Sequence, residues 1–133
     1  MAREIKFRGE SMGSNWIYGL LTKKKIRNSG KISYAIAKDD CSSGNTVPVV
    51  ESSIGEFTGF KDIDDKEIYE GDIVQNEVNP REIYQVAMVD GSWSVLDETI
   101  YSDLHWFLNN VPIEVIGNIH DNPELLEGGE ADD

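Results

Sequence analysis

The sequence predicts a mainly β fold, built from short strands with one or two short helices. Apolar residues alternate with polar ones at a period of two in most segments, as in residues 4–9, which is the spacing of a half-buried strand. β-Branched and aromatic residues dominate the apolar runs, and turn-forming pairs such as Asp90-Gly91 separate them. Together these features predict more strand than helix.

Length and composition limit the organisation of the chain. Its 133 residues are 39% apolar, enough for one modest core, so we expect a single domain over residues 1–127, with residues 22–50 as a variable hairpin and loop excursion. The acidic tail, residues 128–133, is expected to be disordered. No apolar run approaches the roughly 20 residues that span a bilayer, and residues 1–7 lack the apolar centre of a signal peptide. We therefore expect a cytoplasmic protein without a membrane partner.

Charge is distributed unevenly along the chain. Residues 1–38 hold nine Lys or Arg against two acids, a net of +7, and residues 39–133 hold three against twenty-three, a net of −20, which together give −13. The basic segment either lies against the acidic remainder or faces outward as a local basic patch.

The first two strands are expected at residues 4–9, with Ile5 and Phe7 on the buried face, and at residues 16–21 near the centre of a sheet. Gly19 in the second strand predicts a bulge or the close approach of another backbone.

A basic segment, residues 23–31, then interrupts the pattern before a strand at residues 32–36. Its lysines are typical of an edge hairpin that stays soluble and unpaired. Contacts with phosphates, aided by base stacking on Tyr18 and Tyr34, are the alternative.

Residues 38–45 have the composition of a loop, and residues 47–50 are expected to form an edge strand because Pro48 has no N–H to donate to a ladder. The loop carries the single cysteine, Cys41, so neither an internal disulfide nor a cysteine-built metal site is expected. Its acidic neighbours disfavour a reactive thiolate.

Two turns lie close together in residues 62–74. A polar turn leads to Ile68 and Tyr69, and a second turn at Gly71 leads into a β-branched strand. Gly71 is expected at positive φ, which glycine alone adopts without cost.

Further strands are expected at residues 73–78, 81–89, 93–96 and 111–119, with a helix capped by Ser102 or Asp103 and a second helix after Asn122-Pro123. The strand at residues 81–89 is apolar on both faces, which predicts the spine of the core. Much of the core is expected to come from Ile5, Phe7, Trp16, Tyr18, Ile73, Tyr84, Val86, Val115 and Ile119.

Several blocks of sequence carry a family resemblance. They are Arg3-Glu4-Ile5-Lys6-Phe7-Arg8-Gly9, Trp16-Ile17-Tyr18-Gly19, Phe57-Thr58-Gly59-Phe60-Lys61-Asp62, Lys66-Glu67-Ile68-Tyr69-Glu70-Gly71-Asp72-Ile73-Val74 and Ile113-Glu114-Val115-Ile116-Gly117-Asn118-Ile119-His120-Asp121-Asn122-Pro123-Glu124-Leu125-Leu126. In this order they closely resemble the YopX family, which phages and prophages encode.

The resemblance implies a small SH3-like barrel within the mainly β fold, and it supplies no catalytic residue and no cofactor. One departure is Asp64-Asp65, where the family usually has Asn-Gly or a similar glycine turn, so a longer or different turn is expected. The structural motif of the matching blocks is expected to consist of Gly59, Asp62, Ile68, Tyr69, Gly71, Asp72, Gly117, Asn118 and Pro123.

The acids between Asp62 and Asp72 resemble a metal cluster at first sight. The calcium-loop pattern fails, because Glu67 stands where glycine is needed and Ile73 where a bidentate glutamate is needed. We expect solvated turn acids that bind no metal, with a two-carboxylate magnesium site as the alternative.

Signals of catalysis are weak. Neither His105 nor His120 has a second histidine at ligand spacing, and the singly scattered glycines form no phosphate loop. His120-Asp121 is a pair that can orient an imidazole, but no nucleophile or oxyanion donor can be assigned to it.

The sequence favours a non-enzymatic protein-interaction module that binds a phage or host protein, with homo-oligomerisation left open. The alternative is an acidic nucleic-acid mimic that occupies a host DNA-binding protein, because the acidic surplus favours mimicry over direct nucleic-acid binding. A metal-dependent enzyme that uses the acids of Asp62 to Asp72 ranks third.

Overall fold

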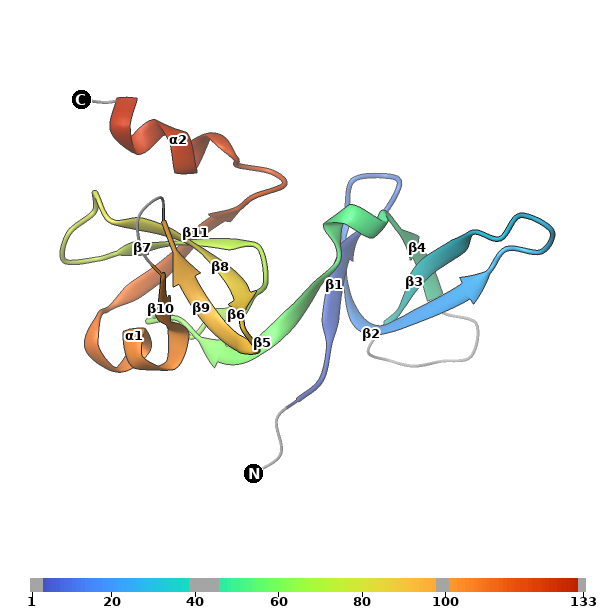
Figure 1. Cartoon of the computed structure of the whole chain (residues 1–133), viewed down its shortest axis with the longest axis horizontal. Helices are drawn as coiled ribbons and strands as arrows, with labels where there is room; N and C mark the ends of the chain where they lie inside the picture. The colour runs from blue at the N-terminus through green and yellow to red at the C-terminus, as the bar shows by residue number, and fades with distance from the viewer. Residues whose placement is uncertain (1–3, 39–45, 98–100, 132–133) are drawn as a thin grey trace. The chain divides into compact units, whose positions relative to one another are not determined.

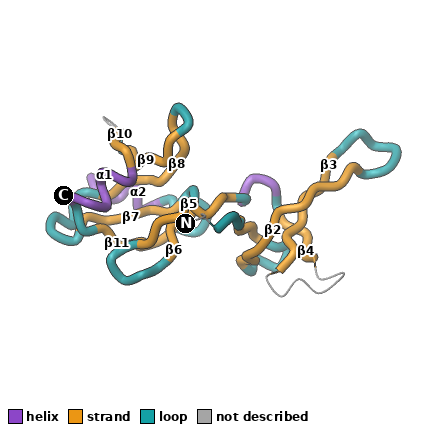
Figure 2. The backbone as a smooth tube through the Cα atoms, turned by 90° about the horizontal axis from the view of Figure 1, so that it is seen from below, coloured by secondary structure: helices purple, strands orange, loops and turns teal. Residues whose placement is uncertain are grey.

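The computed structural model describes residues 4–38, 46–97 and 101–131. These residues form two antiparallel sheets and two short α-helices, so the prediction of a mainly β fold is confirmed (Figure 1; Figure 2). The chain divides into two compact units, Met1–Phe57 and Thr58–Asp133. The single domain over residues 1–127 and the SH3-like barrel stay predictions, and Cys41 lies outside the described residues.

The first unit is built on antiparallel strands in the order β4-β3-β2-β1-β5. The second predicted strand is therefore interior, and the strand that carries Pro48 is at the edge, as expected. A 3₁₀ turn, η1, leads into β5, which continues into the second unit and pairs there with β6. The elements are β1 (Phe7–Glu10), β2 (Trp16–Lys25), β3 (Ile32–Lys38), β4 (Thr46–Val49), η1 (Glu51–Ser53), β5 (Gly55–Lys61) and β6 (Glu67–Tyr69).

The basic segment does not interrupt the strand pattern, so that prediction is wrong. β2 continues through its lysines, with Lys23 opposite Tyr34 and Lys25 opposite Ile32 in β3. Solvated lysines suit an exposed strand end, and the reversal comes only at residues 26–31, where the Ile26 N–H donates to the Lys31 carbonyl at 2.8 Å. At its base the hairpin is interior, because β1 and β4 flank it there. Further out, residues 20–25 of β2 pair only with β3 among the described strands, so the expected edge is found in this part of the hairpin.

The core of the first unit is smaller than predicted. Ile36, Val49 and Phe57 are buried, but Ile5 is 60% exposed and Tyr18 is also exposed, so both are wrong core assignments. Ile5 precedes β1 and therefore has no place on a sheet face. For Tyr18, the period-two pattern identified the strand but not which of its faces is covered. Phe7 and Trp16 are half-buried.

Gly19 confirms the predicted close approach. A Cβ at this position would lie 2.0 Å from the carbonyl oxygen of Ala37 in β3, so a side chain cannot fit without moving the backbone.

The second sheet has the order β10-β9-β8-β7-β11, with every neighbouring pair antiparallel. Both predicted helices are present, and the first begins after Asp103, whose carboxylate accepts the Trp106 N–H at 3.0 Å as predicted. The elements are β7 (Asp72–Asn76), β8 (Ile83–Val89), β9 (Ser92–Leu96), β10 (Tyr101–Asp103), α1 (Leu104–Asn110), β11 (Ile113–Asn118) and α2 (Glu124–Ala131).

The Asp90-Gly91 turn between β8 and β9 is confirmed. Val89 pairs with Ser92, which leaves a two-residue loop, and both loop residues have positive φ, 50° and 84°. These values are those of the hairpin turn whose twist matches that of the strands.

One apolar cluster fills the second unit. Tyr84, Val86 and Val115 belong to it as predicted, Ile73 is also buried, and Ile119 is half-buried. The rings of Tyr84 and Phe107 meet edge to face at a centroid distance of 5.0 Å. The cluster contains Ile68, Val74, Tyr84, Val86, Trp93, Val95, Leu104, Phe107, Ile113 and Val115.

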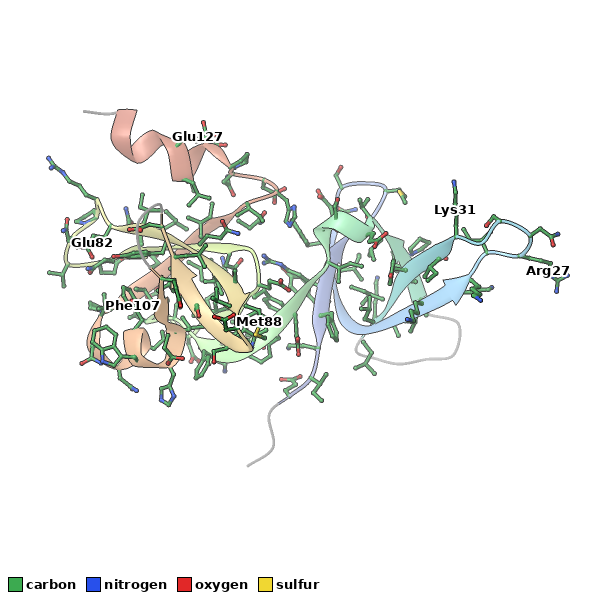
Figure 3. All side chains as sticks on the ribbon, viewed as in Figure 1. Arg27, Lys31, Glu82, Met88, Phe107 and Glu127 are labelled. Carbon is green, nitrogen blue, oxygen red and sulfur yellow. The ribbon has the colours of Figure 1, made fainter. Side chains whose placement is uncertain are left out.

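β8 is covered mainly on one face, so the prediction that it is buried on both faces is wrong. Tyr84 and Val86 are buried, whereas Met88 on the same face is exposed near the strand end. Ala87 and Val89 on the other face are only half-buried. Figure 3 shows Met88 and Phe107 on their elements in this unit.

α2 runs to Ala131, beyond Gly128, where the sequence analysis placed the start of a disordered tail. Asp132 and Asp133 lie outside the described residues.

Candidate functional site

The predicted structural motif centres on Asp62, which is only 7% exposed. Its Oδ1 accepts the backbone N–H groups of Asp64 and Lys66, at 2.8 and 2.9 Å, and its Oδ2 accepts the N–H of Val115 at 2.8 Å. One carboxylate thus closes a local turn and fixes β11 to it. Asp62 is therefore not the solvated turn acid that the sequence predicted.

Asp72 is the second acid that the sequence wrongly placed in solvent. It is 2% exposed, and its Oδ2 accepts the Tyr69 N–H at 2.7 Å across the turn between β6 and β7. Gly71 in this turn has a φ of 92°, as predicted, and is bonded on both sides: its N–H donates to Val86 and its carbonyl accepts from Ile119, each at 2.9 Å. The turn therefore anchors two other segments of the unit.

Thr58, which was not among the predicted motif residues, links two that were, Gly59 and Ile68. Thr58 is buried, and its hydroxyl donates to the Ile68 carbonyl at 2.8 Å and accepts the Phe60 N–H at 3.1 Å. Gly59, between them, has a φ of 91°. A lone threonine in a strand pattern gives no signal of this role, because threonine is common on either face of a strand.

Gly117, Asn118 and Pro123 build the connection from β11 to α2. A Cβ on Gly117 would lie 2.5 Å from Asn122 Oδ1, the atom that accepts the Asn118 N–H at 3.2 Å. Asn118 Oδ1 in turn accepts the N–H groups of His120 and Asp121, each at 2.9 Å. The Pro123 carbonyl then accepts the Leu126 N–H at the start of the helix. These contacts fix the course of the chain between β11 and α2.

The Asp64-Asp65 turn is a tight one. The Asp65 N–H donates to the Asp62 carbonyl at 3.0 Å, and the Asp62 N–H donates to the Lys66 carbonyl at 2.9 Å. Asp65 adopts a φ of 67°, the left-handed conformation that glycine would adopt more easily. Of the two expected alternatives, the longer turn is wrong, and a turn of another type than the family's stays a prediction. Asp65 adopts the strained conformation in place of a glycine.

Carboxylates that stay near solvent in the second unit repel one another. Interaction with Glu77, by hydrogen bonding and then by charge, raises the pKa of Glu114 above its ordinary value. Desolvation, followed by the charge of Glu114, raises the pKa of Asp64. In the described part of the chain, no group of three or more His, Cys, Asp or Glu side chains is placed to hold a metal ion.

The histidines occupy different surroundings. His105 is on the exposed face of α1, and its ring lies 5.5 Å from the Phe60 ring, centroid to centroid. His120 lies in the turn after β11 and is bonded to Asn118 through its backbone.

A second candidate is the basic hairpin, defined here as residues 20–34 of β2, β3 and their connecting turn. It carries five exposed cations, none of which forms an ion pair with any of the described residues. Figure 3 shows Arg27 and Lys31 at the end of the hairpin. The five are Lys23, Lys24, Lys25, Arg27 and Lys31.

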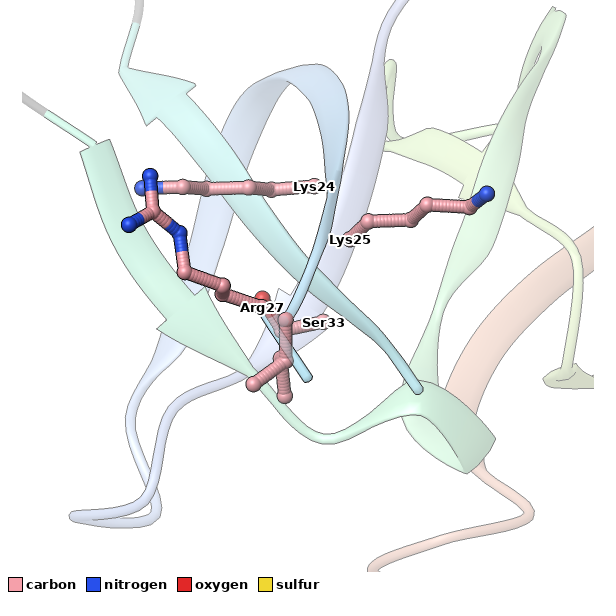
Figure 4. A pocket seen from close by; sticks show the side chains of 5 residues that line it. Lys24, Lys25, Arg27 and Ser33 are labelled. Atoms are coloured by element: carbon pink, nitrogen blue, oxygen red, sulfur yellow. The ribbon is translucent and has the colours of Figure 1, made fainter. Parts of the chain in front are cut away.

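An open depression of about 490 Å³ lies on this hairpin, lined by Lys24, Lys25, Ile26, Arg27 and Ser33. In Figure 4 the side chains of Lys24 and Arg27 extend to one side of the strands and Lys25 to the other. Three apolar side chains beside the cations, Leu20, Ile26 and Ile32, are also exposed. The hairpin therefore offers both positive charge and apolar surface.

The comparisons with known proteins assign the chain to a family. The model of the YopX protein family matches residues 6–127. The chain belongs to the YopX family. None of the α-helices of this YopX-family chain, within the residues described, is long and apolar enough to cross a membrane.

Two solved structures share the fold of this YopX-family chain. Protein EF1440 from Enterococcus faecalis is 24% identical over 94% of this chain and 99% of its own, with a TM-score of 0.59. Protein yopX from Bacillus subtilis is 21% identical over 96% of this chain and 98% of its own, with a TM-score of 0.56. No curated protein sequence matches the chain.

Proposed function

We propose that this YopX-family chain is a non-enzymatic protein-interaction module, and that the basic hairpin is the surface that contacts the partner. One observation carries the proposal: in a chain with 25 acids and 12 bases, the five cations of the hairpin form no ion pair with the described residues. Acidic side chains outnumber basic ones twofold, so neutralisation within the chain would be easy to arrange. Cations kept apart from this surplus are available to an acidic partner.

The charge balance favours a protein partner over a nucleic acid. Residues 58–133 hold 19 acids and three bases, a net of −16, against +3 for residues 1–57. A nucleic acid is negatively charged along its whole length, so the large negative charge of the second unit disfavours its binding to the same chain. A protein partner can confine its negative charge to one acidic patch and therefore meets less of this repulsion.

The exposed apolar side chains support the same choice. Leu20, Ile26 and Ile32 lie among the cations, and protein interfaces combine apolar contact area with charged groups. Phosphate backbones would leave this apolar surface uncovered. The proposed setting is the cytoplasm of a bacterial cell that carries the phage or prophage. The organisms of both solved relatives support the bacterial part of this proposal.

Affinity capture from a bacterial lysate, read by mass spectrometry, tests the proposal. The variant Lys24→Glu with Arg27→Glu reverses two charges that line the depression. The matched control, Lys66→Glu with Arg81→Glu, changes the net charge equally at two exposed sites of the second unit. We expect a partner that the unchanged chain and the control capture and that the hairpin variant loses. Identical captured proteins for all three would contradict the proposal.

A nucleic-acid mimic is the second candidate, and the mutually repelling carboxylates of Asp64, Glu77 and Glu114 favour it. Closely spaced surface carboxylates can imitate the charge of a phosphate backbone. In this case the captured partner would be a DNA-binding protein that an oligonucleotide displaces, and Glu77→Gln with Glu114→Gln would weaken its capture.

The metal-dependent enzyme is the third candidate. Asp62 and Asp72, its two best-buried carboxylates, accept backbone N–H groups through at least three of their oxygen atoms. A metal at these acids would have to compete with the bonds that hold the turns.

A further inference from the structure

Beyond Gly19, the outer side of β2 has no strand beside it among the residues that the structure describes. β1 pairs with β2 only from Trp16 to Gly19, whereas β3 pairs with β2 from Gly19 to Lys25. Among the described residues, those at positions 20–25 therefore have a strand neighbour on one side only. In an antiparallel pair, alternate residues direct their N–H and C=O groups away from the partner strand. This edge thus presents a row of backbone donors and acceptors to solvent.

The side chains of this edge select what can pair with it. Lys23, Lys24 and Lys25 are all exposed. Two copies that paired through this edge would bring lysines opposite or next to lysines, and like charges across strands are destabilising. A strand that carries carboxylates would instead place opposite charges across the pair, which is stabilising. The edge therefore discriminates against a second copy of itself and in favour of an acidic strand.

The alternation along β2 sets where the carboxylates of such a strand must lie. Lys23 faces Tyr34 and Lys25 faces Ile32 in the β3 register, so these two lysines share one face of the hairpin. Lys24 is on the other face opposite Ser33, as its direction in Figure 4 shows, together with exposed Leu20. Carboxylates opposite Lys23 and Lys25 reach these two lysines, and the residues that alternate with them lie on the other face, which carries Lys24 and exposed Leu20.

We propose that an extended acidic segment of a partner protein adds as a strand to residues 20–25 of β2. Its backbone completes the free hydrogen bonds of the edge, and its carboxylates pair with Lys23 and Lys25. The inference rests on the proposed function, since it names the chemistry of the partner for the same hairpin. Main-chain bonds supply affinity in this mode, and the charge pattern supplies selectivity.

A synthetic probe tests strand addition on the whole chain. The probe is a short, terminally blocked and fluorescently labelled peptide of alternating glutamate and valine, titrated against the chain by anisotropy. Its matched control has every backbone nitrogen methylated, which keeps the carboxylates and removes every N–H donor. On the protein side, Lys23→Glu with Lys25→Glu is compared with Lys66→Glu plus Arg81→Glu, after circular dichroism has shown that both variants fold. A thymidine oligonucleotide provides the nucleic-acid arm.

Strand addition predicts salt-sensitive binding of the peptide and slower amide hydrogen exchange at alternate residues of positions 20–25. It also predicts binding weaker by about tenfold or more in two cases. The methylated peptide loses the main-chain hydrogen bonds, and the Lys23 and Lys25 variant loses the charge pairs. The control variant should bind as the unchanged chain does.

Three results would overturn the inference: equal binding of the methylated peptide, tighter binding of the oligonucleotide, or no binding of the peptide at all. These results leave the proposed function standing if the Lys24 and Arg27 variant still loses a captured protein partner. If that capture also fails, both proposals fall.

Discussion

At the scale of single residues, Asp62 joins three backbone amides with one carboxylate. Asp62→Asn replaces one accepting oxygen by an NH₂ group, which faces a backbone donor and leaves it unpaired in a buried place. We expect a loss of about 1 to 3 kcal/mol in the free energy of unfolding, measured by urea denaturation. Asp64→Asn is the control two residues away, and its exposed carboxylate should leave stability unchanged or slightly higher. Equal losses for both variants would show that only net charge matters.

Asp65 has a left-handed backbone conformation that is unfavourable for a residue with a side chain. Its φ of 67° suits glycine, and its contact with Lys61 is an exposed ion pair at 4.0 Å that contributes little. Asp65→Gly is therefore expected to stabilise the unit by about 0.5 to 1 kcal/mol, seen as a higher melting temperature. Asp65→Ala removes the same charge without relieving the strain, so it should be less stable than the original. A glycine variant no more stable than the alanine variant would contradict this account.

At the scale of elements, the turn between β6 and β7 depends on Gly71. Its φ of 92° is one that a β-branched residue adopts only with strain, and its backbone holds both Val86 and Ile119. Gly71→Val should cost about 1 to 2 kcal/mol or more. Gly13→Val is the matched control, because Gly13 does not have positive φ and its nearest neighbouring atoms are 3.9 Å from a built Cβ. A melting temperature that falls equally in both variants would rule out the special role of Gly71.

Turns and caps were predictable from the sequence because neighbouring residues determine them. Strand extents and burial were less predictable because residues distant in the sequence determine them. Asp90-Gly91 and the cap of α1 are set by a few adjacent residues. The turn was predicted correctly, and Asp103 is one of the two caps, Ser102 or Asp103, that the sequence allowed. The continuation of β2 through Lys23 to Lys25 was missed, because pairing with β3 keeps the strand extended whatever its polarity. The burial of Asp62 was missed for a related reason: its partner Val115 is 53 residues away, and no pattern near Asp62 indicates it.

At the scale of the whole molecule, the sequence predicted only part of how charge is distributed. The opposite signs of residues 1–38 and 39–133 are evident from counting. Counting left open whether the basic segment is neutralised, and the cations of the hairpin show no ion pair among the described residues. The repulsion within the acidic unit was equally hidden, since Asp64, Glu77 and Glu114 come from three separate segments.

This repulsion makes a final prediction about stability, salt and pH. The pKa of Glu114 is raised in the folded chain, chiefly by its interaction with Glu77, so the folded state binds a proton more readily than the unfolded state does. The ionised group therefore disfavours the fold at neutral pH, and that penalty is relieved as pH falls through the raised pKa. We expect Glu114→Gln to raise the melting temperature at pH 7, with an advantage that shrinks in acid and at high salt, because salt screens exposed charges. Glu51→Gln in η1 removes the same charge elsewhere and should give a smaller rise at pH 7. If the Glu114 variant keeps its full advantage in acid, the carboxylate acts through its packing and not through its charge.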